Sequence, residues 1–196
     1  MTERLQQIAD FLVEIEKFKL IERVACLSDQ KRRENDAEHS WHLALMIMTL
    51  KDELGIAFDV SHALKIALVH DLVEVYTGDT WVNNAKDKKI KQQKEIEAAN
   101  KLFCQLPSDL NEEMMSYWLE YEKAESIESK IVKGLDKICY PLQYSISGKI
   151  VWHKQEDTTE ERRRYGKPHI EFNEVLQQLY NYFIDQLELT RKAHQK

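Results

Sequence analysis

Glycine and proline are scarce in this chain of 196 residues, which contains only five glycines and three prolines. Because these residues form turns and end helices, their scarcity predicts few turns and long helices. Hydrophobic residues make up 43% of the chain and charged residues 32%, which is typical of a globular protein rather than a disordered one. The length suits a single domain with a substantial buried core.

Paired cysteines, long apolar runs and excess positive charge are also lacking. The three cysteines, Cys26, Cys104 and Cys139, are odd in number and far apart, which favours reduced thiols and a cytoplasmic location. No apolar run approaches the roughly 18 residues of a membrane span, and the first residues lack the apolar core of a signal peptide. The net charge of −6 gives no general attraction to nucleic acids or anionic membranes, so we expect neither as a partner.

Apolar residues recur at helical spacing through most of the chain, and no stretch shows useful strand alternation. Residues 26–35 are interpreted as a loop, and Pro168 is expected to break a charged segment. In the first half of the chain the pattern predicts helices over about 5–15, from a cap at Asn35 or Asp36 to Gly55, and over 63–75, with Gly78 ending the last of these. In the second half it predicts helices over 86–106, over 108–123, from Ser126 toward Pro141, and over 170–189. The sequence therefore predicts an all-α, single compact helical bundle.

An adjacent histidine and aspartate, His70 and Asp71, lie in the otherwise apolar run 68–74. Burying a carboxylate costs several kcal/mol unless it is paired or binds a cation. Two distant residues, His39 and Asp136, are further candidate ligands. Two imidazoles and two carboxylates suit one divalent metal ion (Mn, Co, Fe, Zn, Ni or Mg) with open positions. Such an ion polarises phosphate and generates hydroxide from water.

Each of these residues has a simpler interpretation when it is taken alone. His39 is then more typical of a histidine near a helix end, and Asp136 of a capping or salt-bridging carboxylate beside Lys133 or Lys137. Glu74, one helical turn after the His-Asp pair, either moves protons between water and a leaving group or is an ordinary solvated residue. The order His…His-Asp…Asp is more specific for a metal site than any single member.

The chain resembles the HD-domain superfamily of metal-dependent phosphohydrolases in four segments, Leu20–Arg23, Glu34–Ser40, Ala67–Glu74 with Thr77–Asp79, and Lys130–Lys137. Within that superfamily it is similar to the small all-helical group of bacterial 5′-deoxynucleotidases and the eukaryotic HD-domain-containing protein. The resemblance spans roughly residues 18–144. It implies a single HD domain over residues 1–196, with the metal-site core at about 20–145 and the helix at about 170–189 packed on it.

The resemblance also assigns roles to individual residues. It implies that the metal is held by His39, His70, Asp71 and Asp136. It implies catalytic roles for Glu74, on the attacking water or leaving oxygen, and for Asp79, close to the sugar and the water. Arg23 matches the family arginine that contacts the substrate phosphate, whose oxygens suit a guanidinium fork. Without the resemblance, Arg23 would be assigned to a surface ion pair with Glu22 or Glu16, and Asp79 to a loop cap.

The residue after Arg23 departs from the family pattern. In the bacterial deoxynucleotidases an indole at this position crowds the sugar 2′ position, whereas this chain has Val24. Because a smaller side chain relaxes discrimination between deoxyribose and ribose, the sugar preference does not carry over from the resemblance.

These features predict a metal-dependent phosphomonoester hydrolase that acts on (deoxy)nucleoside 5′-monophosphates. The alternatives are the same chemistry on a cyclic nucleotide, a nucleoside triphosphate or an alarmone, a metal-stabilised nucleotide sensor without turnover, and a structural helical scaffold. The expected partners are a small nucleotide and a second copy of the chain, because apolar positions near Trp118 and in the last helix indicate a homodimer. Tyr117, Trp118 and Tyr121 either line a base-stacking wall or pack in the interior.

Overall fold

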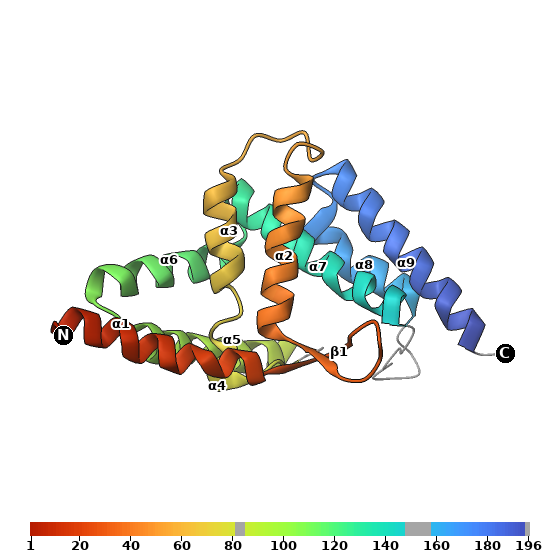
Figure 1. Cartoon of the computed structure of the whole chain (residues 1–196). Coiled ribbons are helices and arrows are strands. Elements are labelled where there is room, and N and C mark those ends of the chain that lie inside the picture. Colours follow the sequence, from red (N-terminus) through yellow and green to blue (C-terminus); the bar gives the residue numbers. More distant parts are fainter. Residues whose placement is uncertain (81–84, 148–157, 195–196) are drawn as a thin grey trace.

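The computed structural model describes residues 1–80, 85–147 and 158–194, which form a helical bundle with one small β-hairpin (Figure 1). The helices are α1 (Glu3–Glu14), the 3₁₀ helix η1 (Ile15–Leu20), α2 (Asp36–Leu50), α3 (Val60–Val69), α4 (Glu74–Thr77), α5 (Ala85–Phe103), α6 (Ser108–Lys123), α7 (Ile127–Ser147), α8 (Thr159–Ile170) and α9 (Glu174–His194). The strands are β1 (Glu22–Cys26) and β2 (Arg33–Asn35). The predicted all-α single-domain bundle is confirmed.

The domain limits of 1–196 stay a prediction, because they include residues 81–84, 148–157 and 195–196, which lie outside the described residues. Among the helices that the structure describes, none has the length and apolar character needed to span a membrane.

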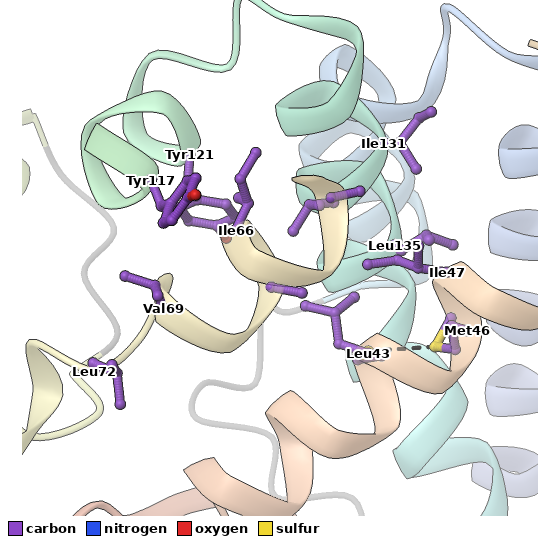
Figure 2. Close-up of a cluster of buried hydrophobic side chains, with 14 of the residues drawn as sticks. Leu43, Met46, Ile47, Ile66, Val69, Leu72, Tyr117, Tyr121, Ile131 and Leu135 are labelled. Carbon is purple, nitrogen blue, oxygen red and sulfur yellow. Dashed lines mark hydrogen bonds between the residues drawn. The ribbon is translucent and has the colours of Figure 1, made fainter. Parts of the chain in front are cut away.

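Helix α7 is the centre of the fold, because α2, α3, α6, α8 and α9 all pack against it (Figure 1). Its residues Ile131, Leu135 and Ile138 are fully buried and follow the spacing of a single helical face. Figure 2 shows side chains of α2, α3, α6 and α7 gathered in one buried hydrophobic cluster. A polar residue on the inner face of α7 is therefore held rigidly in the middle of the molecule.

The helix predicted over 63–75 is interrupted at the His-Asp pair. Helix α3 ends at Val69, and α4 begins only at Glu74. Residues 70–73 between them form a tight turn with hydrogen bonds from residue i+3 to residue i of 2.9 to 3.2 Å. A continuous α-helix would point His70 and Asp71 about 100° apart. The tighter turn instead brings Nε2 of His70 within 3.0 Å of Oδ2 of Asp71.

The loop predicted over 26–35 is partly ordered as a β-hairpin. Strands β1 and β2 pair antiparallel, with Glu22 opposite Asn35 and an irregular register between the ends. The strands are too short for alternation to be visible in the sequence. The predicted cap is confirmed. The Asn35 side chain accepts a hydrogen bond from the Glu38 backbone N–H at 2.9 Å, and the Glu38 carboxylate accepts one from the Asn35 backbone N–H at 3.1 Å. The hairpin places Arg23 beside the start of α2.

Two prolines lie inside helices rather than at their ends. Helix α7 continues past Pro141 to Ser147, and Pro168 lies in the last turn of α8 instead of breaking it. Proline removes one backbone donor from a helix, but buried residues on both sides of Pro141, Ile138 and Tyr144 among them, anchor α7 in the core. Because α8 runs to Ile170, the last helix begins at Glu174 rather than near residue 170.

The contact between α8 and α9 depends on Gly166. A Cβ atom at this position would lie 2.8 Å from Cε1 of Tyr180 and even closer to Cζ, and the Tyr180 hydroxyl is fixed by donation to the Arg162 carbonyl at 2.6 Å.

We expect Gly166→Ala to lower the free energy of unfolding by about 1–3 kcal/mol, although alanine favours helix, because the ring or the helix must move. Chemical denaturation measures this change. Lys167→Ala, at an exposed neighbour, is the control, and equal stability of the two variants would contradict the packing.

Candidate metal centre

The four predicted metal ligands come from three separate segments and converge in the middle of the bundle. His39 lies near the start of α2, His70 and Asp71 lie in the turn after α3, and Asp136 lies on α7. Nε2 of His39 is 3.2 Å from Oδ1 of Asp136 and 3.8 Å from Oδ2 of Asp71. His39 and His70 face each other with ring centroids 5.4 Å apart. Ligand atoms of His39, His70 and Asp136 lie within 4.8 Å of one another, and Asp71 approaches both histidines.

The protonation pattern of the histidines suits metal binding. Nδ1 of His70 donates to the Ala67 carbonyl at 2.7 Å, which leaves its Nε2 lone pair available. The Nε2 atoms of His39 and His70 are buried and make no hydrogen bond within the described part of the chain, although carboxylate oxygens lie 3.0 to 3.2 Å away. Buried polar atoms are rarely left unpaired in folded proteins. A divalent cation among these donors would satisfy them, so the residues present fit the predicted ion.

The two histidines differ in their electrostatic environment. Burial, assisted by the positive charge of Arg23, lowers the pKa of His39 to about 4. Burial acts in the same direction on His70, but the adjacent Asp71 carboxylate outweighs it and raises the pKa of His70 above its usual value. The neutral, metal-binding form is therefore favoured at His39, whereas protonation competes more strongly with a cation at His70.

The two aspartates are held in their charged form. Burial favours the neutral carboxylic acid, but His70 and Arg23 outweigh it and hold the pKa of Asp71 well below its usual range. Lys137 and His39 do the same for the pKa of Asp136. Both carboxylates are therefore charged, and able to bind a cation, at neutral pH.

Arg23 lies at the edge of this cluster and contacts one of its members directly. Its Nη1 atom is 3.0 Å from Oδ1 of Asp36 and 3.0 Å from Oδ2 of Asp71, and its Nε is 3.8 Å from Oε2 of Glu34. Burial alone would lower the pKa of Arg23, but the surrounding carboxylates raise it well above normal. The alternative of a surface ion pair with Glu22 or Glu16 is wrong, because the partners of Arg23 are the buried carboxylates of the site.

Glu74 and Asp79 also reach the site. Glu74 is only 4% exposed, so the alternative of an ordinary solvated residue is wrong. Burial, with the nearby Asp71 and Asp36 carboxylates, raises the pKa of Glu74 to about 11. Asp79 is half-buried in the loop after Gly78, and its charge acts on both Arg23 and Glu74. Glu74 therefore lies beside the candidate ligand Asp71, and Asp79 is near enough to Arg23 and Glu74 to influence their charge.

Asp36 belongs to the site, although the sequence alone predicts only a capping role for it. This residue is fully buried, and its Oδ2 has no hydrogen-bond partner among the residues described. Oxygens of Asp36, Asp71 and Glu74 lie within 4.8 Å of one another. Since Asp36 precedes His39 by three residues on the same helical face, its spacing was a usable signal.

The residues that lie behind the candidate ligands were not predicted from the sequence to be parts of the site. Lys91 of α5 donates to the Thr80 carbonyl at 2.8 Å and lies 3.9 Å from Oε1 of Glu74. Lys137 and Tyr121 both contact Oδ2 of Asp136. The base-stacking alternative for Tyr121 is not what the structure shows, because the side chain is 6% exposed and lies behind the candidate ligands.

The family model of the HD domain matches residues 15–179, so the chain belongs to the HD-domain family. Among curated relatives it is 35% identical over 115 residues to human 5′-deoxynucleotidase HDDC2, a match that covers 59% of this chain and 55% of the relative. The chain thus spans little more than half the length of the curated relatives it matches.

Solved structures give a more complete match. A protein described as a predicted metal-dependent phosphohydrolase, from Magnetospirillum magnetotacticum, aligns with a TM-score of 0.82 at 31% identity over 97% of each chain. DatZ, an HD phosphohydrolase from cyanophage S-2L solved with dA and one catalytic Zn²⁺, aligns with a TM-score of 0.57 at 20% identity over 92% of this chain and 96% of its own. At that identity, the second likeness shows the fold alone.

Metal binding is expected to release a proton from His70. Because the adjacent Asp71 carboxylate raises the pKa of His70, a proton competes with the cation for this histidine. The association constant should therefore increase as the pH rises, by up to about tenfold per pH unit below the pKa of His70. Calorimetric titration with Mn²⁺ in buffers of different ionisation enthalpy counts the released protons. Binding that is independent of pH, or weaker at higher pH, would show that His70 is not a ligand.

Proposed function

We propose that this protein is a divalent-metal-dependent phosphomonoester hydrolase that acts on (deoxy)nucleoside 5′-monophosphates. The observation that supports the proposal is the pair of buried, unpaired histidine nitrogens facing two charged aspartates, with Arg23 in contact with the same cluster. The relatedness to 5′-deoxynucleotidases supports the choice of substrate. The proposed metal ligands are His39, His70, Asp71 and Asp136.

Each residue of the site has a defined part in the proposed reaction. A bound divalent cation would activate water and polarise the phosphate. Arg23 neutralises charge on the phosphoryl oxygens, since its cationic fork matches their geometry. Glu74 is buried beside the cluster, and because its pKa is raised its carboxyl group holds a proton that it can deliver to the leaving 5′ oxygen. Asp79 contributes a second carboxylate on the substrate side.

We also propose self-association through exposed apolar helix faces. Trp118 itself is only 2% exposed, but the neighbouring Leu119 is 38% exposed, and Tyr182 and Leu189 of the last helix are 56% and 60% exposed. On α2, the exposed residues Trp41 and Met48 form part of a second apolar stripe. A homodimer would cover one of these faces.

The location and the partner class are further parts of the proposal. The free cysteines support a cytoplasmic location. The net negative charge supports a small nucleotide as the partner rather than a nucleic acid or a membrane surface.

Substrate choice can be tested by phosphate release from the metal-loaded full chain. We expect turnover of 5′-monophosphates in paired deoxyribose and ribose forms, and much less with a cyclic nucleotide, a triphosphate or an alarmone. Val24→Trp should lower turnover of the ribonucleotides more than that of the deoxyribonucleotides, because the larger ring crowds the 2′ position. Tight nucleotide binding without phosphate release from any compound would instead identify a sensor.

The roles of two acidic residues can be separated by measuring metal content and turnover together. Asp71→Ala should lose both, because it removes a ligand. Glu74→Gln should keep the metal and lower kcat by about a hundredfold or more, the effect of losing an acid–base group. Glu97→Gln, on the exposed face of α5, is the control. Full activity of Glu74→Gln would remove Glu74 from the mechanism.

A further inference from the structure

The two carboxylate oxygens of Asp136 have different surroundings. Oδ1 faces Nε2 of His39 at 3.2 Å. Oδ2 accepts a hydrogen bond from the Tyr121 hydroxyl at 2.8 Å and lies 2.6 Å from Nζ of Lys137. Since two donors already occupy Oδ2, only Oδ1 is available to a cation shared with His39.

Tyr121 is itself held firmly in place. Its ring packs on the ring of His70, with centroids 4.8 Å apart and a tilt of 57°, so that one side chain touches two candidate ligands. Lys133 contacts Tyr121 in two further places. Its Nζ lies 4.5 Å from the centroid of the Tyr121 ring and donates a hydrogen bond to the Tyr121 backbone carbonyl at 3.1 Å. The hydroxyl therefore has little freedom to leave Asp136.

The number of oxygens that Asp136 offers affects which cation fits. Ca²⁺ takes six to eight oxygen ligands and often binds carboxylates through both oxygens. Zn²⁺ is usually four-coordinate, and Mn²⁺ is octahedral, with a lower coordination number than Ca²⁺ can reach, so one oxygen from a carboxylate suffices for either ion. An aspartate whose second oxygen is blocked therefore disfavours the larger ion.

We propose that Tyr121 and Lys137 are positioning residues that keep Asp136 a one-oxygen ligand and so select small divalent cations over Ca²⁺. This inference rests on the metal site of the proposed function. It extends the site by a layer that touches neither substrate nor cation and acts only through Asp136. Partners of this kind typically change metal affinity by 10- to 100-fold.

Tyr121→Phe tests the inference, because it removes the hydroxyl and keeps the ring on His70. Dissociation constants for Mn²⁺ and Ca²⁺ are measured with the full chain, and the visible absorption spectrum of the Co²⁺-loaded protein reports the coordination geometry. We expect the preference for Mn²⁺ over Ca²⁺ to fall by about tenfold or more, with a changed Co²⁺ spectrum. Tyr117→Phe is the matched control, because Tyr117 lies one turn earlier on α6 beside Tyr121 (Figure 2). Its hydroxyl donates to Glu113 instead of a candidate ligand.

Lys137→Met supplies a second variant, should Tyr121→Phe fail to fold. Its change in net charge affects both divalent ions alike and cancels in the ratio of their affinities, so a lower ratio again supports the inference. An unchanged ratio and an unchanged Co²⁺ spectrum in a folded variant would overturn it. If the native chain bound neither Mn²⁺ nor Co²⁺, both the proposed metal site and this inference would be wrong. Metal binding with the expected variant effects but without phosphate release would remove only the proposed reaction.

Discussion

The structure depends on keeping two carboxylates, those of Asp71 and Asp136, charged within a helical bundle. Burial by itself would neutralise such groups, and the protein offsets this with cations that lie in direct contact. Arg23 bridges Asp36 and Asp71, and Lys137 lies against Asp136. The Nε2 atoms of His39 and His70, which make no hydrogen bond within the described segments, then face the charged aspartates, which is the arrangement a divalent cation would complete.

The same helix provides both the core and the site. Helix α7 carries Ile131, Leu135 and Ile138 into the hydrophobic cluster, and Asp136 follows directly after Leu135. Any shift of α7 would therefore move a ligand and disturb the packing of five helices together. Gly166 on α8 allows one of these neighbouring elements to pack closely against α9. The position of the candidate metal centre is thus fixed by apolar packing rather than by the polar groups alone.

Membership of the HD-domain family and the geometry of the site point in the same direction. The four candidate ligands converge as that family resemblance implies, and the residues around them explain how each is oriented. Ala67 fixes the tautomer of His70, and Tyr121 orients Asp136. Such indirect contacts determine how many positions around a cation stay open to water and phosphate.

The sequence by itself determined the helical class and most helix starts, because helical periodicity and capping are local. It also identified the candidate ligands, because burying a histidine and an aspartate in an apolar run is costly without a partner. It left open what depends on long-range contact. The tight turn at His70, the short hairpin that carries Arg23, the burial of Asp36 and the pairing of Asp136 with Tyr121 were decided only in the tertiary structure. Their physical reason is that packing brings distant segments together, and nothing in the local pattern of residues records which donor will meet which carboxylate.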